Sequence, residues 1–209
     1  MIEQLLKAKG YHQKNQLDEA YELYQQILAQ EPRHTEALHL SGLIAYARQN
    51  YPLAIELIQQ AIEQSPNTFH FYSNLGNVLS DMGEIEQAIT AYQKCLELNP
   101  DFAEGWNNLG SVYLSQQNYV EAIPALEKAV VLQPHYLDAH QNLGSIFKQM
   151  GQWEKALFHF QQIMGLTPDD ISAYLQAGTL LFRLNRWEES IQHFEKVISL
   201  EPTHWAAHL

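Results

Sequence analysis

The chain has 209 residues, of which 46% are apolar and 17% are charged, so a folded core is expected and disorder is not. Its net charge of −12 opposes contact with phosphate backbones, and a nucleic-acid partner is therefore not expected. The single cysteine, Cys95, excludes an internal disulfide.

The N-terminal stretch MIEQLLKAKGYH has neither a long apolar run nor a small-residue cleavage site, so it does not look like a secretory signal. No stretch of the chain approaches the roughly 18 apolar residues that a membrane-spanning helix needs. We therefore expect a cytoplasmic protein that does not insert into membranes.

Prolines recur every 34 residues along the chain. They are Pro32, Pro66, Pro100, Pro134, Pro168 and Pro202. This register divides the chain into six repeats, at residues 1–34, 35–68, 69–102, 103–136, 137–170 and 171–204. Residues 205–209 then begin a seventh repeat. We expect the whole chain, 1–209, to form a single array.

Two helices are predicted in each repeat. Apolar residues at positions 4, 7, 8 and 11 of the repeat lie on one face of a first helix, and those at positions 20, 24, 27 and 28 do the same for a second. Between them, positions 15 and 16 carry residues that accept a left-handed backbone and close a helix. They are Asn15, Asn50, Gly83, Asn118, Gly151 and Asn185. Acidic residues then begin the second helix, and the proline at position 32 ends it.

Small residues occupy two positions of the repeat where paired helices would approach closely. Position 8 carries Ala8, Gly42, Gly76, Gly110, Gly144 and Gly178. Position 20 carries Ala20, Ala54, Ala88, Ala122, Ala156 and Ser190. Together with the period and the prolines, these residues resemble the tetratricopeptide repeat family. The resemblance implies an all-α, right-handed α-solenoid, a superhelix of tandem helix–turn–helix hairpins, that acts as a protein–protein interaction scaffold.

The first helices carry a row of amide and hydroxyl side chains on the side opposite to their apolar face. In the family that the chain resembles, this face lines a concave groove that binds peptides. The resemblance therefore implies a peptide-binding site at Asn74, Asn77, Asn107, Asn108, Ser111, Gln141, Asn142, Ser145 and Gln176. An amide both donates and accepts hydrogen bonds, so a row of amides suits an extended peptide backbone of any sequence.

The same face is apolar in the second repeat, where Leu40, Leu43 and Tyr46 replace the polar row. Because backbone hydrogen bonds contribute only about 0.5–1.5 kcal/mol each, a peptide needs a further anchor. We expect Leu40, Leu43 and Tyr46 to provide it.

Three alternatives stay open. Asn74, Asn108 and Asn142 resemble the asparagine ladder in the repeat arm of O-linked N-acetylglucosamine transferases, so the chain is alternatively the substrate-selecting arm of a larger transferase. The uncapped C-terminal end, with Trp205 and Leu209, suggests homo-oligomerisation instead. The asparagines are also common in tetratricopeptide repeats generally, where they lie on a solvated face.

No motif indicates an enzyme, a metal site or a cofactor. The chain lacks a glycine-rich phosphate loop, a Gly-x-Ser-x-Gly elbow and a zinc signature. His204 and His208 have the spacing of two helical metal ligands but no third. Lys9, Lys148 and Arg183 are too scattered to grip a carboxylate tail. We expect a binding protein with a protein or peptide partner.

Overall fold

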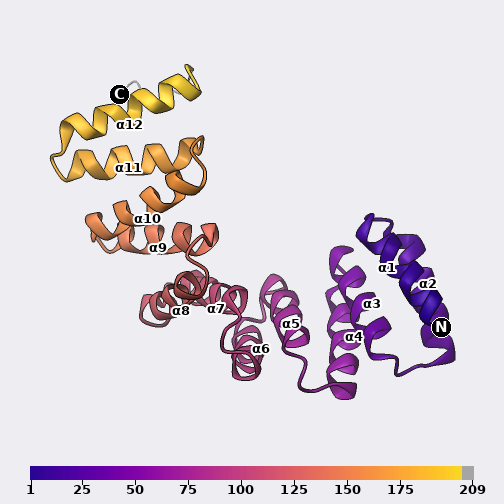
Figure 1. Cartoon of the computed structure of the whole chain (residues 1–209). Coiled ribbons are helices and arrows are strands. Elements are labelled where there is room, and N and C mark those ends of the chain that lie inside the picture. Colours follow the sequence, from indigo (N-terminus) through magenta and orange to yellow (C-terminus); the bar gives the residue numbers. More distant parts are fainter. Residues whose placement is uncertain (204–209) are drawn as a thin grey trace. The chain divides into compact units, whose positions relative to one another are not determined.

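A computed structural model describes residues 1–203, which contain twelve α-helices and no strand (Figure 1). The helices are α1 (Ile2–Gln13), α2 (Leu17–Gln30), α3 (Thr35–Ala47), α4 (Tyr51–Gln64), α5 (Phe69–Met82), α6 (Ile85–Leu98), α7 (Ala103–Ser115), α8 (Tyr119–Leu132), α9 (Leu137–Gln149), α10 (Trp153–Leu166), α11 (Ile171–Arg183) and α12 (Trp187–Leu200). The predicted all-α helical repeat fold is confirmed. The predicted seventh repeat, with Trp205 and Leu209, and the His204–His208 pair lie outside the described residues.

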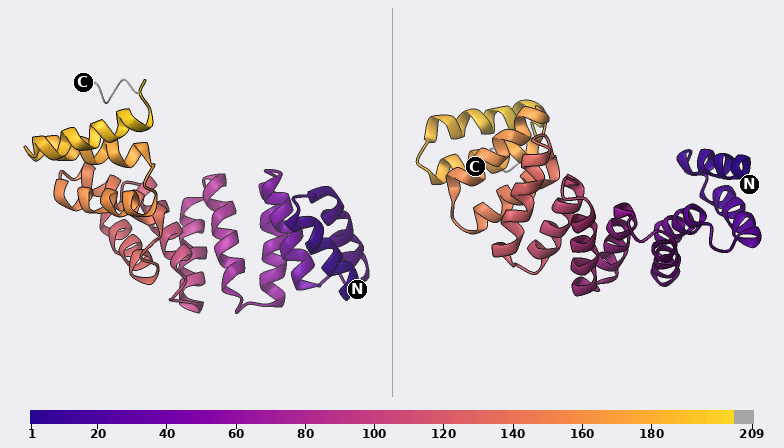
Figure 2. Two further views of the ribbon diagram at one scale, coloured as in Figure 1. Left: turned by 45° about the horizontal axis from the view of Figure 1, so that its top comes forward. Right: turned by 60° about the horizontal axis from the view of Figure 1, so that its bottom comes forward.

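Each repeat contains one pair of helices packed side by side (Figure 2). The second helix always ends two residues before the repeat's proline. This limit is expected, because proline disfavours the helical conformation of the residue before it.

The prediction for the turn between paired helices was wrong in two repeats. A left-handed backbone always falls at position 15, so Gln49 (φ 59°) and Gln117 (φ 57°) adopt it in repeats 2 and 4. The neighbouring asparagines instead cap the next helix. Asn50 Oδ1 accepts from the Leu53 backbone N–H, and Asn118 Oδ1 accepts from that of Glu121, both at 3.4 Å. Asparagine is suited to both roles, and the sequence alone does not separate them.

The small residue at position 8 lets the two helices of a hairpin approach. A Cβ added at Gly110 would lie 2.6 Å from Leu126 Cγ, and one added at Gly76 would lie 2.6 Å from the Tyr92 ring. Position 8 of the first helix therefore faces position 24 of the second, and any larger side chain there displaces the core.

The chain divides into two compact units. Unit 1 is Met1–Asp101 and contains α1 to α6, and unit 2 starts at Phe102 and contains α7 to α12. In unit 1, Tyr24, Ile27 and Ile44 are fully buried members of an apolar cluster, and in unit 2 a separate cluster includes Leu126 and Leu143. That the six repeats form a single array stays a prediction.

No helix within residues 1–203 is long and apolar enough to cross a membrane. The location of the protein in the cytoplasm stays a prediction.

Candidate functional site

Polar side chains link the first helices of neighbouring repeats in unit 1. The Asn74 amide nitrogen on α5 lies 2.8 Å from His39 Nε2 on α3. Since an amide nitrogen only donates, His39 Nε2 accepts, and the proton of this imidazole lies on Nδ1. Burial and the nearby His70 lower the pKa of His39 to about 4, so the ring is neutral at pH 7. We call the side of the first helices that carries these polar residues the first-helix face.

Asn77, one turn after Asn74, is held by its own hairpin. The Tyr92 hydroxyl on α6 donates to Asn77 Oδ1 at 2.7 Å. Tyr92 itself is 2% exposed, so this hydrogen bond satisfies a hydroxyl that would otherwise be buried without a partner.

In unit 2 the predicted amide row forms a hydrogen-bonded network. Asn142 Nδ2 on α9 donates to Ser111 Oγ at 3.0 Å and to Asn107 Oδ1 at 3.4 Å, both on α7. Asn107 Nδ2 in turn donates to Asn108 Oδ1 at 3.5 Å. Asn107 is only 5% exposed, so it positions the neighbouring amides rather than offering a surface. The network fixes the orientation of the Asn142 amide before any partner arrives.

The remaining predicted groove residues of unit 2 differ in their exposure. Gln176 on α11 accepts a hydrogen bond at 2.7 Å from the Lys148 ammonium on α9. Gln141 is exposed and Ser145 is half-buried. The structure therefore brings Asn107, Asn108, Ser111 and Asn142 together, and leaves Gln141 and Ser145 outside their network.

The predicted apolar anchor separates into two parts. Leu40 and Leu43 line a pocket of about 380 Å³ in unit 1. Its other lining residues are Lys9, His12, Gln13 and Tyr24. Tyr46 is not among the residues that line this pocket. Its hydroxyl donates instead to Asp81 Oδ2 on α5 at 2.6 Å. Burial and this carboxylate raise the pKa of Tyr46. We call the cavity that Leu40 and Leu43 line the Tyr24 pocket.

Two residues that line the Tyr24 pocket carry buried polar atoms that sequence reasoning missed. Among residues 1–203, neither the Tyr24 hydroxyl nor His12 Nδ1 has a hydrogen-bond partner, although both atoms are buried. Buried polar groups are nearly always bonded, so these two are exceptions that need an explanation. The available signal was a tyrosine at position 24, where Ile58, Leu126 and Phe160 are apolar.

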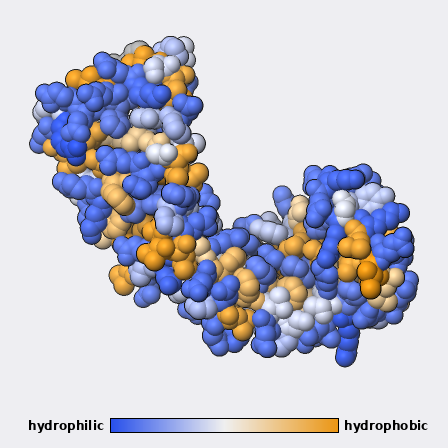
Figure 3. All heavy atoms as spheres, viewed as in Figure 1, coloured by the Kyte–Doolittle hydropathy of each residue, from blue (hydrophilic) through white to orange (hydrophobic). Residues whose placement is uncertain are grey.

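The surface near the first hairpin is also apolar. Figure 3 shows hydrophobic atoms gathered over α1. Ile2 is 79% exposed and Leu6 is 64% exposed.

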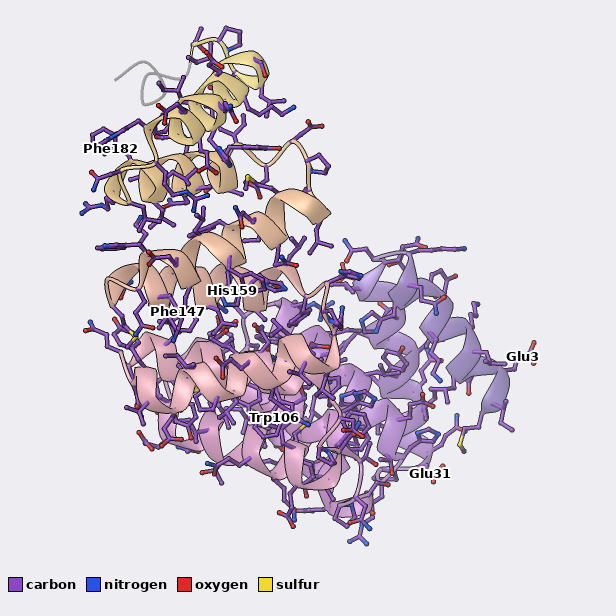
Figure 4. All side chains as sticks on the ribbon, turned by 60° about the vertical axis from the view of Figure 1, so that its left-hand side comes forward. Glu3, Glu31, Trp106, Phe147, His159 and Phe182 are labelled. Atoms are coloured by element: carbon purple, nitrogen blue, oxygen red, sulfur yellow. The ribbon has the colours of Figure 1, made fainter. Side chains whose placement is uncertain are left out.

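Unit 2 contains a buried histidine pair that the sequence analysis did not identify. His140 Nδ1 on α9 lies 2.9 Å from His159 Nδ1 on α10, and His140 Nε2 lies 3.0 Å from the Pro134 carbonyl oxygen. The carbonyl only accepts, so His140 Nε2 donates, and in the neutral pair His159 Nδ1 donates to His140 Nδ1. His159 stacks on Phe147, with ring centroids 5.6 Å apart (Figure 4). Burial, and next the charge of His140, lower the pKa of His159 to about 4.

Within residues 1–203, no group of three histidine, cysteine, aspartate or glutamate side chains is placed to hold a metal ion. The side chains gathered on the first-helix face are amides, hydroxyls, apolar groups and the imidazole of His39. Chemically, this arrangement is suited to hydrogen bonding and apolar contact.

Family models match most of the chain. One described as a TPR repeat matches residues 76–117. Three described as tetratricopeptide repeats match residues 5–67, 101–169 and 171–204. No curated protein matches the chain at a significant level.

Solved structures share the fold. A crystal structure of MamA is 26% identical with a TM-score of 0.71, covering 77% of this chain and 94% of its own. PilF from Pseudomonas aeruginosa is 15% identical with a TM-score of 0.83, covering 98% and 93%. YrrB, described as a TPR protein with an unusual peptide-binding site, is 19% identical with a TM-score of 0.72, covering 88% and 95%. The likeness to PilF and YrrB concerns the fold alone.

Proposed function

Since the chain belongs to the tetratricopeptide repeat family, we propose that it is a protein–protein interaction scaffold that binds an extended segment of a partner on its first-helix face. The family and the similar structures support an interaction scaffold. The observation that carries the finer proposal is the fixed amide network of unit 2, in which Asn142 bridges α9 to α7.

Preorganised amides bind a peptide backbone at a lower entropic cost than mobile ones. The Asn142 amide is held by two hydrogen bonds from its nitrogen, and among residues 1–203 no protein donor contacts its Oδ1 atom. That oxygen is therefore suited to accept a hydrogen bond from a partner's backbone N–H. One such bond contributes about 0.5–1.5 kcal/mol, so amides alone give weak binding.

An apolar anchor raises this affinity. Burying one large apolar side chain contributes about 1.5–3 kcal/mol, more than a single amide hydrogen bond. In unit 1 the Tyr24 pocket offers such a surface through Leu40 and Leu43. We therefore infer binding rather than catalysis, with affinity from apolar burial and orientation from amides.

Affinity measurements on peptides selected from a random display library test this proposal. The purified chain is compared with an Asn142→Ala variant and a Leu43→Ala variant, and Gln161→Ala, an exposed position on α10, is the control. We expect a loss of roughly 2- to 12-fold for Asn142→Ala, the equivalent of one hydrogen bond. Leu43→Ala should lose more, and Gln161→Ala should bind as the native chain does.

Unchanged affinity in both face variants would contradict the proposal, because the peptides would then bind elsewhere. Light scattering on the same samples tests the alternative of homo-oligomerisation. A mass that rises with protein concentration would favour self-association over a peptide partner.

A further inference from the structure

The two tyrosines at position 24 of the repeat differ in one respect. Tyr92 in repeat 3 is 2% exposed, and its hydroxyl donates to Asn77 at 2.7 Å. Tyr24 in repeat 1 is fully buried, and its hydroxyl has no partner among residues 1–203. The same side chain at the same position is thus bonded in one repeat and unbonded in the other.

The cause lies at position 9 of the first helix. Repeat 3 has Asn77 there, whose oxygen accepts the tyrosine proton, whereas repeat 1 has Lys9. An ammonium has no acceptor. Lys9 instead forms an ion pair with Glu36 on α3 and lines the pocket. Repeat 1 therefore lacks the acceptor that the tyrosine hydroxyl has in repeat 3.

His12 supplies a second unbonded polar atom in the same pocket. Its Nδ1 atom is buried and has no partner among residues 1–203, and its ring centroid lies 6.2 Å from that of Tyr24. Burial lowers the pKa of His12, so the ring is neutral at pH 7 and one ring nitrogen accepts. The pocket thus combines a hydroxyl with an imidazole nitrogen.

We propose that the Tyr24 pocket takes a tyrosine side chain of the bound partner, whose ring packs against Leu40 and Leu43. Both polar atoms are buried in the free chain, so the pocket side chains move on binding, and the ligand hydroxyl then bonds the Tyr24 hydroxyl and His12 Nδ1. This proposal rests on the proposed function, since it names the residue that anchors the peptide. The pocket volume of about 380 Å³ is within the range of ligand-binding pockets.

A phenol fits better than the other groups with an apolar body. A hydroxyl donates one hydrogen bond and accepts others, so it satisfies both Tyr24 and His12, whereas an indole N–H only donates and a phenylalanine ring does neither. A carboxylate or a phosphate is disfavoured by charge. The positive charge of Lys9 is paired with Glu36. Burial, and next the negative charge of Glu36, raise the pKa of Tyr24 to about 12, so an anion beside the Tyr24 hydroxyl is disfavoured.

Three peptides that differ in one residue test the proposal. The sequence Gly-Ser-Gly-X-Gly-Ser-Gly is used with tyrosine, phenylalanine or phosphotyrosine at X. Binding to the full chain is followed by NMR through the methyl signals of Leu40 and Leu43. We expect the tyrosine peptide to bind at least tenfold more tightly than either of the others, because a site built for a hydroxyl rejects its analogue strongly.

Two variants separate a binding role from a structural one. Tyr24→Phe removes a hydroxyl that has no partner among residues 1–203, so the fold should persist. The preference for tyrosine over phenylalanine should fall severalfold, because the ligand hydroxyl loses one of its two partners and keeps His12. Tyr92→Phe is the matched control, in which the preference should remain.

Equal binding of the tyrosine and phenylalanine peptides to the native chain would overturn the proposal, as would a preference that Tyr24→Phe leaves unchanged. Tighter binding of the phosphotyrosine peptide would overturn it too, because it would require a net positive pocket. If the tyrosine preference is absent but display-selected peptides still lose affinity with Asn142→Ala, only the tyrosine proposal fails and the proposed function stands. If Asn142→Ala and Leu43→Ala also leave the affinity unchanged, the proposed function fails as well.

Discussion

The two units use the same 34-residue frame and differ in how far their polar groups are satisfied. In unit 2 the amides of the first-helix face bond to one another, from Asn142 to Ser111 and Asn107. In unit 1 the Tyr24 hydroxyl and His12 Nδ1 are buried next to an apolar surface and have no hydrogen-bond partner within the described residues 1–203.

This difference indicates that the two units are suited to different roles. A bonded amide has a fixed orientation and positions a peptide backbone without choosing its sequence. An unbonded buried hydroxyl costs free energy until a ligand satisfies it, so it discriminates between side chains. Unit 2 is accordingly suited to hold an extended chain, and unit 1 is suited to select a particular side chain.

The largest expected effect is a loss of folding stability at acidic pH. The pKa of His159 is about 4 in the folded chain, against an ordinary value of 6.5, so at low pH the unfolded state takes up a proton that the folded state resists. Stability is full above pH 6.5 and is lost as the pH falls towards 4. One pKa unit corresponds to about 1.4 kcal/mol, which gives a loss on the order of 3 kcal/mol as an upper limit.

Denaturant unfolding at pH 7 and pH 4.5 measures this loss. A His159→Phe variant should lose less stability between the two values than the native chain, and the exposed His135→Gln is the control. The pKa of His39 in unit 1 is lowered to about 4 as well, so some acid sensitivity should remain in the variant. An unchanged pH dependence in His159→Phe would contradict the assignment.

Overpacking gives the next largest effect and tests the division into units. Even a Cβ atom added at Gly110 would lie 2.6 Å from Leu126 Cγ, so Gly110→Val would overpack the core. It should lower the free energy of unfolding by roughly 1–3 kcal/mol. Because a repeat contacts only its neighbours, the loss of hydrogen-exchange protection should concentrate in unit 2. Gly165→Ala on α10 has no neighbour within 4 Å and should instead stabilise by about 0.5–1 kcal/mol. Equal loss of protection in α1 to α6 would argue against two separate units.

The smallest effect compares asparagines at one repeat position. Asn142→Ala removes two hydrogen bonds and regains at most about 0.7 kcal/mol of helix propensity, so it should destabilise by about 1 kcal/mol. Asn74→Ala removes the single bond to His39 and should be closer to neutral. Urea unfolding of both variants resolves the difference. If Asn142→Ala were as stable as the native chain, the hydrogen-bond network would contribute nothing to the free energy of unfolding.

The fold could be predicted from sequence because it depends on local patterns. A proline every 34 residues and a small residue at position 8 fix the hairpins, and both patterns are visible in the letters alone. The turns were harder, since asparagine suits both the left-handed and the capping position, and Asn50 and Asn118 proved to be caps.

The site could be predicted only in outline. The sequence predicts Asn142 and Leu43 as groove residues, but which amides bond one another depends on the distance between α7 and α9. Tyr24 occupies a packing position and is fully buried, so the sequence alone indicates a core residue and not a hydroxyl without a partner. The bonded state of its hydroxyl depends on position 9, fifteen residues earlier, where lysine replaces asparagine.

The most direct test is an NMR map of one display-selected, tyrosine-containing peptide on the isotopically labelled full chain. We expect the largest shifts at Leu40 and Leu43 of unit 1, smaller shifts at the amides of Asn108 and Asn142, and none at the exposed Glu127 on α8 and Gln161 on α10. Shifts confined to α8, α10 and the other second helices would contradict the account, because the partner would then bind away from the first-helix face.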